Sequence, residues 1–274
     1  MRTFLKLIVA AGIAVSAATG LAYAAGDVKP AKKVDFSFEG PFGAFDRGQL
    51  QRGYQVYLEV CAACHSMNLL AYRNLSEKGG PEFPAEQVKA FAAAAEVTAG
   101  PNDEGEMFER PGIPADRFVA PFPNEQAARA SNDGAYPPDL SLLAKARAGY
   151  HGIINQLIQG SGGPEYIYSV LTGYQQPDAE HAKDAPEGKH FNPYYENGPW
   201  ISMAAPLSDD QLEYSDGTPA TVDQMSKDVS AFLMWAAEPH LEHRKQMGFK
   251  VMIFLIILGF LLYLTKRKIW RDVH

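Results

Sequence analysis

The sequence of 274 residues predicts a mainly α protein, in which a small helical domain with long loops precedes one C-terminal transmembrane helix. Three observations predict this class. Apolar residues recur at helical spacing over residues 46–61 and 221–237. Residues 100–123 and 192–199 are dense in Pro, Gly, Asn and Asp, as is typical of loops, and no run indicates a large sheet. Residues 247–265 are apolar.

The N-terminal segment, residues 1–24, has the pattern of a secretory signal peptide. Arg2 and Lys6 give it a positive start, residues 7–21 are apolar and uncharged, and residues 22–24 form a small-x-small cleavage site. An uncleaved N-terminal anchor is the alternative, but the Ala-rich core and the cleavage site favour removal. We therefore expect the mature chain to be exported.

The first helix of the domain is predicted over residues 46–61, where Asp46 is suited to cap the N-terminus. Its apolar side consists of Leu50, Gly53, Tyr54, Tyr57 and Val60. Shorter helices are predicted over residues 85–95, 140–148 and 165–171. The last helix of the domain spans residues 221–237, with Thr221 as its cap, and Pro239 ends it.

The apolar run of residues 247–265 contains one charged residue, Lys250, whose ammonium group can reach the lipid headgroups. Its length is close to the roughly 20 residues that a bilayer core requires, which predicts one spanning helix; a helix buried in a protein core is the alternative. The signal peptide places residues 25–246 outside, in the periplasm, and leaves residues 266–274 as a cytoplasmic tail. We expect a single-pass protein of the bacterial inner membrane.

Charge is distributed unevenly along the chain, whose net charge is -7. Residues 25–249 hold 18 Lys and Arg against 31 Asp and Glu, a net charge of -13. This excess argues against nucleic-acid binding and favours a cationic partner attracted by electrostatic steering. The clearest acidic clusters are Asp103, Glu104, Glu106 and Glu109, and Asp209, Asp210, Glu213 and Asp216. For each cluster, solvated loop charge is the alternative interpretation.

The most informative motif is Cys61-Ala62-Ala63-Cys64-His65. Two thiols at this spacing can form thioether bonds with the two vinyl groups of one porphyrin, and the histidine can bind the iron as an axial ligand. A thioredoxin-like redox pair lacks the histidine, and a zinc site needs more thiolates than these two cysteines, the only ones in the sequence. The motif predicts one covalently bound haem c.

A low-spin haem that carries electrons requires a second axial ligand, a thioether or an imidazole. Met203 is favoured because residues 198–206 form an irregular segment, braced by prolines, that can present a thioether without helical constraint. Met225 and Met234 fall in a helix that already has a packing role. His151 is the best alternative ligand, and a core-filling role is the alternative for Met203. Methionine ligation would close the sixth site, which argues against oxygen or peroxide chemistry.

The mature chain resembles the cytochrome c1 family, the haem-bearing subunits of the cytochrome bc1 complex, in its alphaproteobacterial form. The matching segments are residues 36–40, 52–57, 137–141, 162–168, 171–173, 203–206 and 235–239. The resemblance implies a class I cytochrome c-like domain. It also implies that Gly53 and Tyr57 form the close-packing pair where the first helix crosses the last one.

The resemblance assigns roles to individual residues. It matches Cys61 and Cys64 to the thioether positions, His65 to the proximal iron ligand and Met203 to the distal iron ligand. It implies that Pro138 lines the haem edge and that Arg147 and Tyr166 contact the haem propionates. A guanidinium and a phenol can donate hydrogen bonds to carboxylates, although a surface cation and a packed aromatic ring remain the alternatives.

The resemblance further implies a one-electron relay that is not an enzyme on its own. The chain would take an electron from the Rieske iron–sulfur protein, beside cytochrome b in a dimeric ubiquinol–cytochrome c reductase, and pass it to a cytochrome c. A membrane-tethered cytochrome c serving a terminal oxidase is the closest alternative. A haem-based ligand sensor or peroxidase with an open sixth site is a second alternative, and it requires Met203 to be off the iron.

Overall fold

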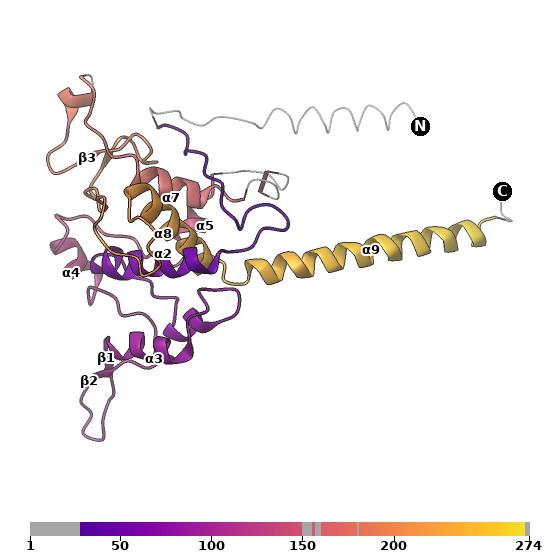
Figure 1. Cartoon of the computed structure of the whole chain (residues 1–274), viewed down its shortest axis with the longest axis horizontal. Helices are drawn as coiled ribbons and strands as arrows, with labels where there is room; N and C mark the ends of the chain where they lie inside the picture. The colour runs from indigo at the N-terminus through magenta and orange to yellow at the C-terminus, as the bar shows by residue number, and fades with distance from the viewer. Residues whose placement is uncertain (1–27, 150–154, 157–159, 180, 272–274) are drawn as a thin grey trace.

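The computed structural model describes residues 28–149, 155–156, 160–179 and 181–271, and it forms a helical domain from which one long helix, α9, projects (Figure 1). The predicted signal peptide and His151 lie outside the described residues. The described helices are α2 (Arg47–Glu59), α3 (Ala85–Ala93), α4 (Glu125–Ala130), α5 (Leu143–Ala146), α7 (Gly163–Leu171), α8 (Val222–Ala237) and α9 (Leu241–Ile269), with short 3-10 helices at Cys61–Ala63, Tyr72–Ser76 and His181–Asp184. The strands are β1 (Glu96–Ala99), β2 (Phe108–Pro111), β3 (His190–Phe191) and β4 (Trp200–Ile201). The predicted mainly α class is confirmed.

The two long helices of the domain, α2 and α8, begin where the sequence predicts. Asp46 accepts a hydrogen bond from the Gln49 amide at 3.0 Å, and Thr221 accepts one from the Gln224 amide at 3.2 Å. These side chains satisfy amides that have no partner inside the helix. The shorter helices α3 and α7 are also confirmed. By contrast, α5 covers only four residues of the predicted range 140–148, because the backbone before it is hydrogen-bonded to the segment after the haem motif.

The crossing of α2 and α8 lies at the centre of the domain. A Cβ atom on Gly53 would lie 2.1 Å from the carbonyl oxygen of Asp228 and 2.7 Å from the Phe232 Cβ, so the two backbones can approach this closely only at a glycine. Tyr57 is buried one turn later, with its ring centroid 6.0 Å from that of Phe232. Arg52 Nε lies 2.9 Å from the fully buried Asp228 carboxylate. The close packing expected at Gly53 and Tyr57 is confirmed.

The described residues contain two small antiparallel sheets of two strands each. Glu96 of β1 lies opposite Pro111 of β2, and His190 of β3 lies opposite Ile201 of β4. The sequence predicts only loop for β2, because a strand of four residues that is largely exposed has too little alternation to distinguish it from a loop. The β1–β2 hairpin extends from the domain (Figure 1).

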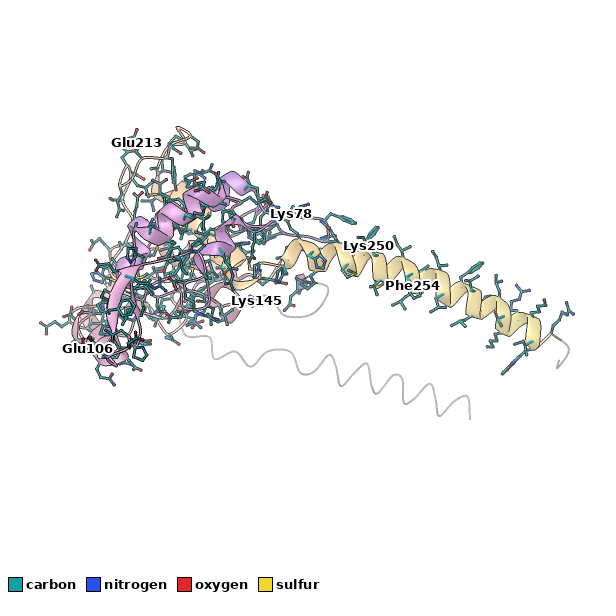
Figure 2. All side chains as sticks on the ribbon, turned by 90° about the horizontal axis from the view of Figure 1, so that it is seen from below. Lys78, Glu106, Lys145, Glu213, Lys250 and Phe254 are labelled. Atoms are coloured by element: carbon teal, nitrogen blue, oxygen red, sulfur yellow. The ribbon has the colours of Figure 1, made fainter. Side chains whose placement is uncertain are left out.

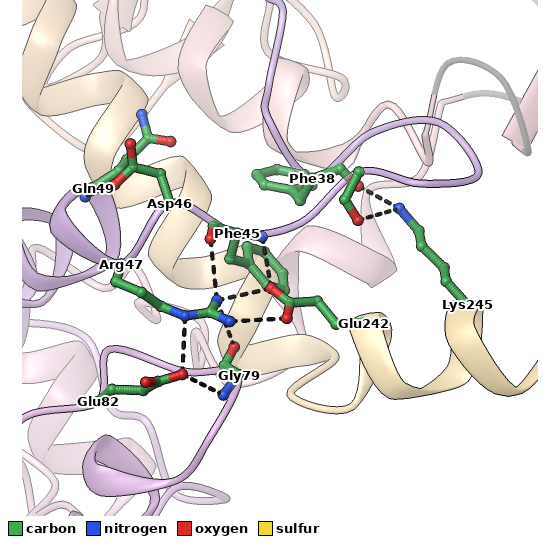
Figure 3. Close-up of polar contacts among 10 residues, drawn as sticks. Phe38, Phe45, Asp46, Arg47, Gln49, Gly79, Glu82, Glu242 and Lys245 are labelled. Atoms are coloured by element: carbon green, nitrogen blue, oxygen red, sulfur yellow. Dashed lines mark hydrogen bonds and ion pairs between the residues drawn. The ribbon is translucent and has the colours of Figure 1, made fainter.

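The C-terminal helix α9 begins at Leu241, six residues before the predicted span, directly after the turn at Pro239. It is the one helix in the described part of the chain that is long and apolar enough to cross a membrane, and none of its apolar window is buried. Arg47 fixes its exit from the domain through two contacts of 2.8 Å to the Glu242 carboxylate, which also accepts the Phe45 amide (Figure 3). The chain is a single-pass membrane protein.

Candidate haem site

The Cys-Ala-Ala-Cys-His motif folds as a tight turn at the C-terminal end of α2. The amides of Cys64 and His65 both bond to the Cys61 carbonyl oxygen, at 3.1 and 2.9 Å. This turn brings the two thiols and the imidazole onto one short piece of backbone. Both cysteines are free thiols; Cys64 is exposed and Cys61 is half-buried. Burial, followed by the neighbouring Cys64, raises the pKa of the Cys61 thiol to about 12, so an uncharged thiol or thioether suits this position.

His65 is oriented by one hydrogen bond. Its Nδ1 lies 2.8 Å from the Pro138 carbonyl oxygen, which can only accept, so Nδ1 carries the proton. The lone pair is then on Nε2, the nitrogen that remains available to an iron atom. Burial lowers the pKa of His65 and favours the neutral imidazole that a metal requires. A histidine prepared in this way fits a haem ligand.

The segment of residues 137–141 is fastened along the residues after the motif. The Leu140 amide bonds to the Ser66 carbonyl oxygen at 2.8 Å, and Asp139 accepts hydrogen bonds from Ser66 Oγ and from the Asn68 amide at 2.9 and 2.8 Å. Burial disfavours the Asp139 carboxylate, but these bonds and those from Ser141 outweigh burial and lower its pKa. Pro138 is thereby held against His65.

Arg147 and Tyr166 meet at a third residue, Glu196. Arg147 Nε lies 2.9 Å from a Glu196 carboxylate oxygen, and the Tyr166 hydroxyl accepts the Glu196 amide at 3.3 Å. Burial raises the pKa of Tyr166, so its hydroxyl keeps a proton that it can donate. Arg147 also retains guanidinium donors beyond Nε, because a guanidinium has five. The two residues predicted to hold propionates therefore lie together, with an internal carboxylate that competes for the guanidinium.

Met203 lies in irregular backbone directly after β4, as the sequence predicts. Its carbonyl oxygen accepts the Tyr174 hydroxyl at 3.0 Å, and the preceding Ser202 hydroxyl accepts Lys189 Nζ. Asn192, fully buried, donates to the Val170 carbonyl oxygen at 2.7 Å and ties the β3 side of this sheet to α7. The Met203 side chain is only partly buried.

The other methionines and histidines occupy different environments. Met67, Met225 and Met234 are core residues with exposed fractions of 0%, 0% and 4%. His181 Nδ1 lies 2.7 Å from the Asp178 carboxylate, and its ring packs against Phe191. Among the described methionines outside α9, Met107 is exposed and Met203 is the one that is partly buried. His151, its rival, lies outside the described residues.

Two residues of this region, Glu196 and Tyr174, have no recognisable pattern in the sequence, and a third, Asp139, has only a local one. Glu196 and Tyr174 stand in polar, aromatic-rich loops, where neither spacing nor a motif separates a positioning residue from a surface one. Asp139 lies within residues 137–141, which resemble the family, but the resemblance assigns it no role. An Asp two residues before Ser141 is typical of an Asx turn, and the Ser141 amide does bond to Asp139 Oδ1 at 2.9 Å. Only that local turn could have been expected.

Comparison with known proteins places these features in a family. The Cytochrome C1 family model matches residues 36–273. "Cytochrome c1" of Cereibacter sphaeroides is 47% identical over 290 aligned residues, which cover 98% of this chain and 96% of that protein. "Cytochrome c1 1, heme protein, mitochondrial" of Arabidopsis thaliana is 49% identical and covers 81% of this chain and 66% of that protein.

One relative is much longer than this chain, and only part of it is similar to this chain. "Cytochrome b/c1" of Bradyrhizobium diazoefficiens is 54% identical over 253 residues, which cover 90% of this chain but 36% of that protein. The chain therefore spans about a third of that relative. The family model covers the haem motif, the segment around Met203 and the whole of α9. The chain belongs to the cytochrome c1 family.

Proposed function

We propose that the chain is the electron-transfer subunit of a ubiquinol–cytochrome c reductase, which takes one electron from a Rieske iron–sulfur protein and passes it to a cytochrome c. The hydrogen bond from His65 Nδ1 to the Pro138 carbonyl oxygen carries this proposal most directly, because it leaves Nε2 available to iron at a Cys-x-x-Cys-His motif. Family membership supplies the choice among c-type haem proteins.

Each site residue has a task that its environment supports. Cys61 and Cys64 would hold one haem covalently, and a haem bound there supplies a one-electron iron couple. His65 and Met203 would bind the iron, and Pro138 would line the haem edge. Met203 would leave no open position for oxygen or peroxide, which fits a carrier better than a sensor.

Arg147 and Tyr166 would direct donors at the propionates. A guanidinium and a protonated phenol offset carboxylate charge and fix the orientation of the ring to which it belongs. Glu196 holds both side chains at one place, so it acts as a positioning residue. Loss of Glu196 would free Arg147 to move. The charge beside the propionates would then change, and with it the reduction potential of the haem.

The domain of residues 25–246 would face the periplasm and residues 266–274 the cytoplasm of a bacterial inner membrane, with cytochrome b as the membrane partner in a dimeric complex. The predicted signal peptide and family membership support this orientation. Protease added to spheroplasts should remove the domain and spare an epitope fused to the C-terminus. Purification through that epitope should bring cytochrome b and a Rieske protein with the chain. Purification with a terminal oxidase alone would favour the tethered carrier.

Met203→Leu tests the iron ligand. Loss of a thioether that favours ferrous iron should lower the midpoint potential by on the order of 100 mV, within the roughly 0.8 V range that axial ligands span, and should remove the thioether-to-iron absorption band. Met107→Leu is the matched control, since Met107 is 60% exposed on the β1–β2 hairpin. An unchanged potential in Met203→Leu would remove Met203 as the ligand and return His151 to consideration.

A further inference from the structure

A pocket with a volume of about 620 Å³ opens where α9 leaves the domain. It is lined by residues of α5, α8, the first turns of α9, the loop before α2 and the described part of the segment between α5 and α7. Among the described residues that form it are Phe38, Glu39, Lys145, Glu238, Arg244 and Lys245. None of the predicted haem-site residues belongs to this lining. Figure 2 shows Lys145 at the end of the domain from which α9 projects.

The pocket has an excess of positive charge. Lys145 Nζ lies 3.3 Å from the Glu238 carboxylate, and Arg244 Nε contacts the same carboxylate, so two cations share one anion. Burial opposes ionisation of Glu238, but Arg244 and Lys145 outweigh it and lower its pKa, which keeps this carboxylate charged. Lys245 adds a third cation, held by hydrogen bonds to the Phe38 and Gly43 carbonyl oxygens at 2.5 and 3.3 Å (Figure 3).

Glu39 lies beside a second buried carboxyl, Glu165. Burial raises the pKa of both groups, and their proximity raises that of Glu39 further, so the pair tends to share one proton. Its Oε1 atom is buried and has no hydrogen-bond partner within the described residues. Three cations of the lining then face the Glu238 carboxylate and a carboxyl pair that tends to share a proton, which leaves the lining with an excess of positive charge. An anion is the ligand that such a pocket attracts.

The predicted span of residues 247–265 places the pocket at the depth of the lipid headgroups. Residues 247–265 correspond to about 28 Å of helix, close to the roughly 30 Å of a hydrocarbon core. Arg244 and Lys245 precede this run by only about 3–5 Å along the helix axis. Met234 and Leu241 add apolar lining beside the cations. An amphipathic anion fits this mixture better than a fully hydrated one does.

We propose that this pocket binds the phosphate headgroup of an anionic membrane lipid. Lys145 and Arg244 would contact the phosphate, Lys245 would add long-range attraction, and Met234 and Leu241 would lie against the glycerol and upper acyl carbons. A lipid bound here would fill the angle between the domain and α9, and it would hold the domain at a fixed height above the membrane. The site is independent of the electron-transfer role proposed above.

The test uses the full-length chain with its haem in phosphatidylcholine vesicles that contain a trace of spin-labelled phosphatidylglycerol. The motionally restricted fraction of the spectrum gives the affinity relative to spin-labelled phosphatidylcholine. Wild type should prefer the anionic lipid, and Lys145→Gln should reduce this preference by about fivefold, since each cation near a lipid surface contributes about 1 kcal/mol. Equal affinity for both lipids in wild type would overturn the proposal.

Two further variants separate the pocket from general surface charge and from misfolding. Lys78→Gln removes an exposed lysine near the same end of the domain (Figure 2) but outside the pocket lining, and it should leave the preference unchanged. Glu238→Gln removes the carboxylate that pairs with Lys145 and Arg244 and should increase the preference, which a partly unfolded protein would not do. A reduced preference in Glu238→Gln, or an equal loss in Lys78→Gln and Lys145→Gln, would contradict the site.

The same vesicles distinguish a lipid from free phosphate. Inorganic phosphate at millimolar concentration should leave the labelled phosphatidylglycerol bound, because it lacks the apolar part that Met234 and Leu241 would contact. Full displacement by millimolar phosphate would show a general phosphate site and would overturn the assignment to lipid. None of these outcomes depends on electron transfer, so the proposed function stands or falls separately.

Discussion

At the scale of single residues, the carbonyl oxygen of Pro138 determines which nitrogen of His65 is available to a metal. Proline suits this position because it has no amide hydrogen to satisfy and its φ angle is fixed. Asp139, the next residue, holds the segment through bonds to Ser66 and Asn68. The motif therefore supplies the imidazole, and a segment more than 70 residues later supplies its orientation.

Gly53→Ala tests the close approach of α2 and α8. The added Cβ would lie 2.1 Å from the Asp228 carbonyl oxygen, so α2 and α8 would have to separate. We expect a loss of about 1–3 kcal/mol in the free energy of unfolding, as for other overpacked cores, measured by denaturant titration of the haem-loaded protein. Gly48→Ala in the same helix meets only side-chain atoms, at 3.3 Å or more, and should change stability little. Equal stability of the two variants would contradict a tight crossing.

At the scale of elements, the contacts of Glu242 link α9 to the start of α2. Glu242→Gln should weaken the bidentate contact with Arg47 by about 1.5 kcal/mol and speed amide exchange at Phe45 and in the first turn of α9 roughly tenfold. The exposed pair of Glu86 with Lys89 gives the control, since Glu86→Gln should leave exchange in α9 unchanged. Unaltered exchange in Glu242→Gln would show that packing alone holds the junction.

The same junction should respond to pH. Burial opposes ionisation of Glu242, but the contacts with Arg47 and the Phe45 amide outweigh it and lower its pKa below the ordinary value of 4.5. A carboxylate whose folded pKa is lowered stabilises the fold above its unfolded pKa, and this stabilisation is lost as the pH falls through the folded value. The protection factors of amides in the first turn of α9, which correct for the intrinsic pH dependence of exchange, should therefore fall below about pH 4.5 in wild type and change less in Glu242→Gln. The same pH dependence in both proteins would contradict this role.

The helices were predictable where local signals are strong, and other elements were not. Asp46 and Thr221 cap helices whose apolar stripes face the core, so the ends of α2 and α8 followed from sequence alone. The β1–β2 hairpin depends on pairing between residues that are exposed or only half-buried, and such pairing leaves little pattern in one strand. The candidate iron ligands could be predicted from the haem motif and from the prolines around Met203. Glu196 and Tyr174 could not, because their contacts are with residues 49 and 29 positions away in the sequence.

At the scale of the whole molecule, negative charge predominates in the domain and positive charge gathers where α9 leaves it. Figure 2 shows Glu106 and Glu213 at the end of the domain far from α9, and Lys145 and Lys250 at the α9 end. Asp216 is paired with Arg52 at 2.8 Å, and Asp209 accepts the Val222 amide, so part of the second acidic cluster serves the fold. The hairpin cluster is the better candidate for meeting a cationic partner.

Reduction of a basic cytochrome c should therefore slow as salt rises. With a net charge of -13 over residues 25–249, electrostatic steering should raise the association rate at least about tenfold at low ionic strength, and this gain is lost as the Debye length shrinks to about 3 Å at 1 M salt. Stopped-flow measurement of the rate of cytochrome c reduction at increasing salt concentrations tests this dependence. Ferricyanide is the matched control, because an anionic oxidant is repelled by the same charge and its reduction should accelerate with salt. Glu104→Gln with Glu106→Gln should flatten the cytochrome c dependence, and a salt-independent rate in wild type would exclude steering.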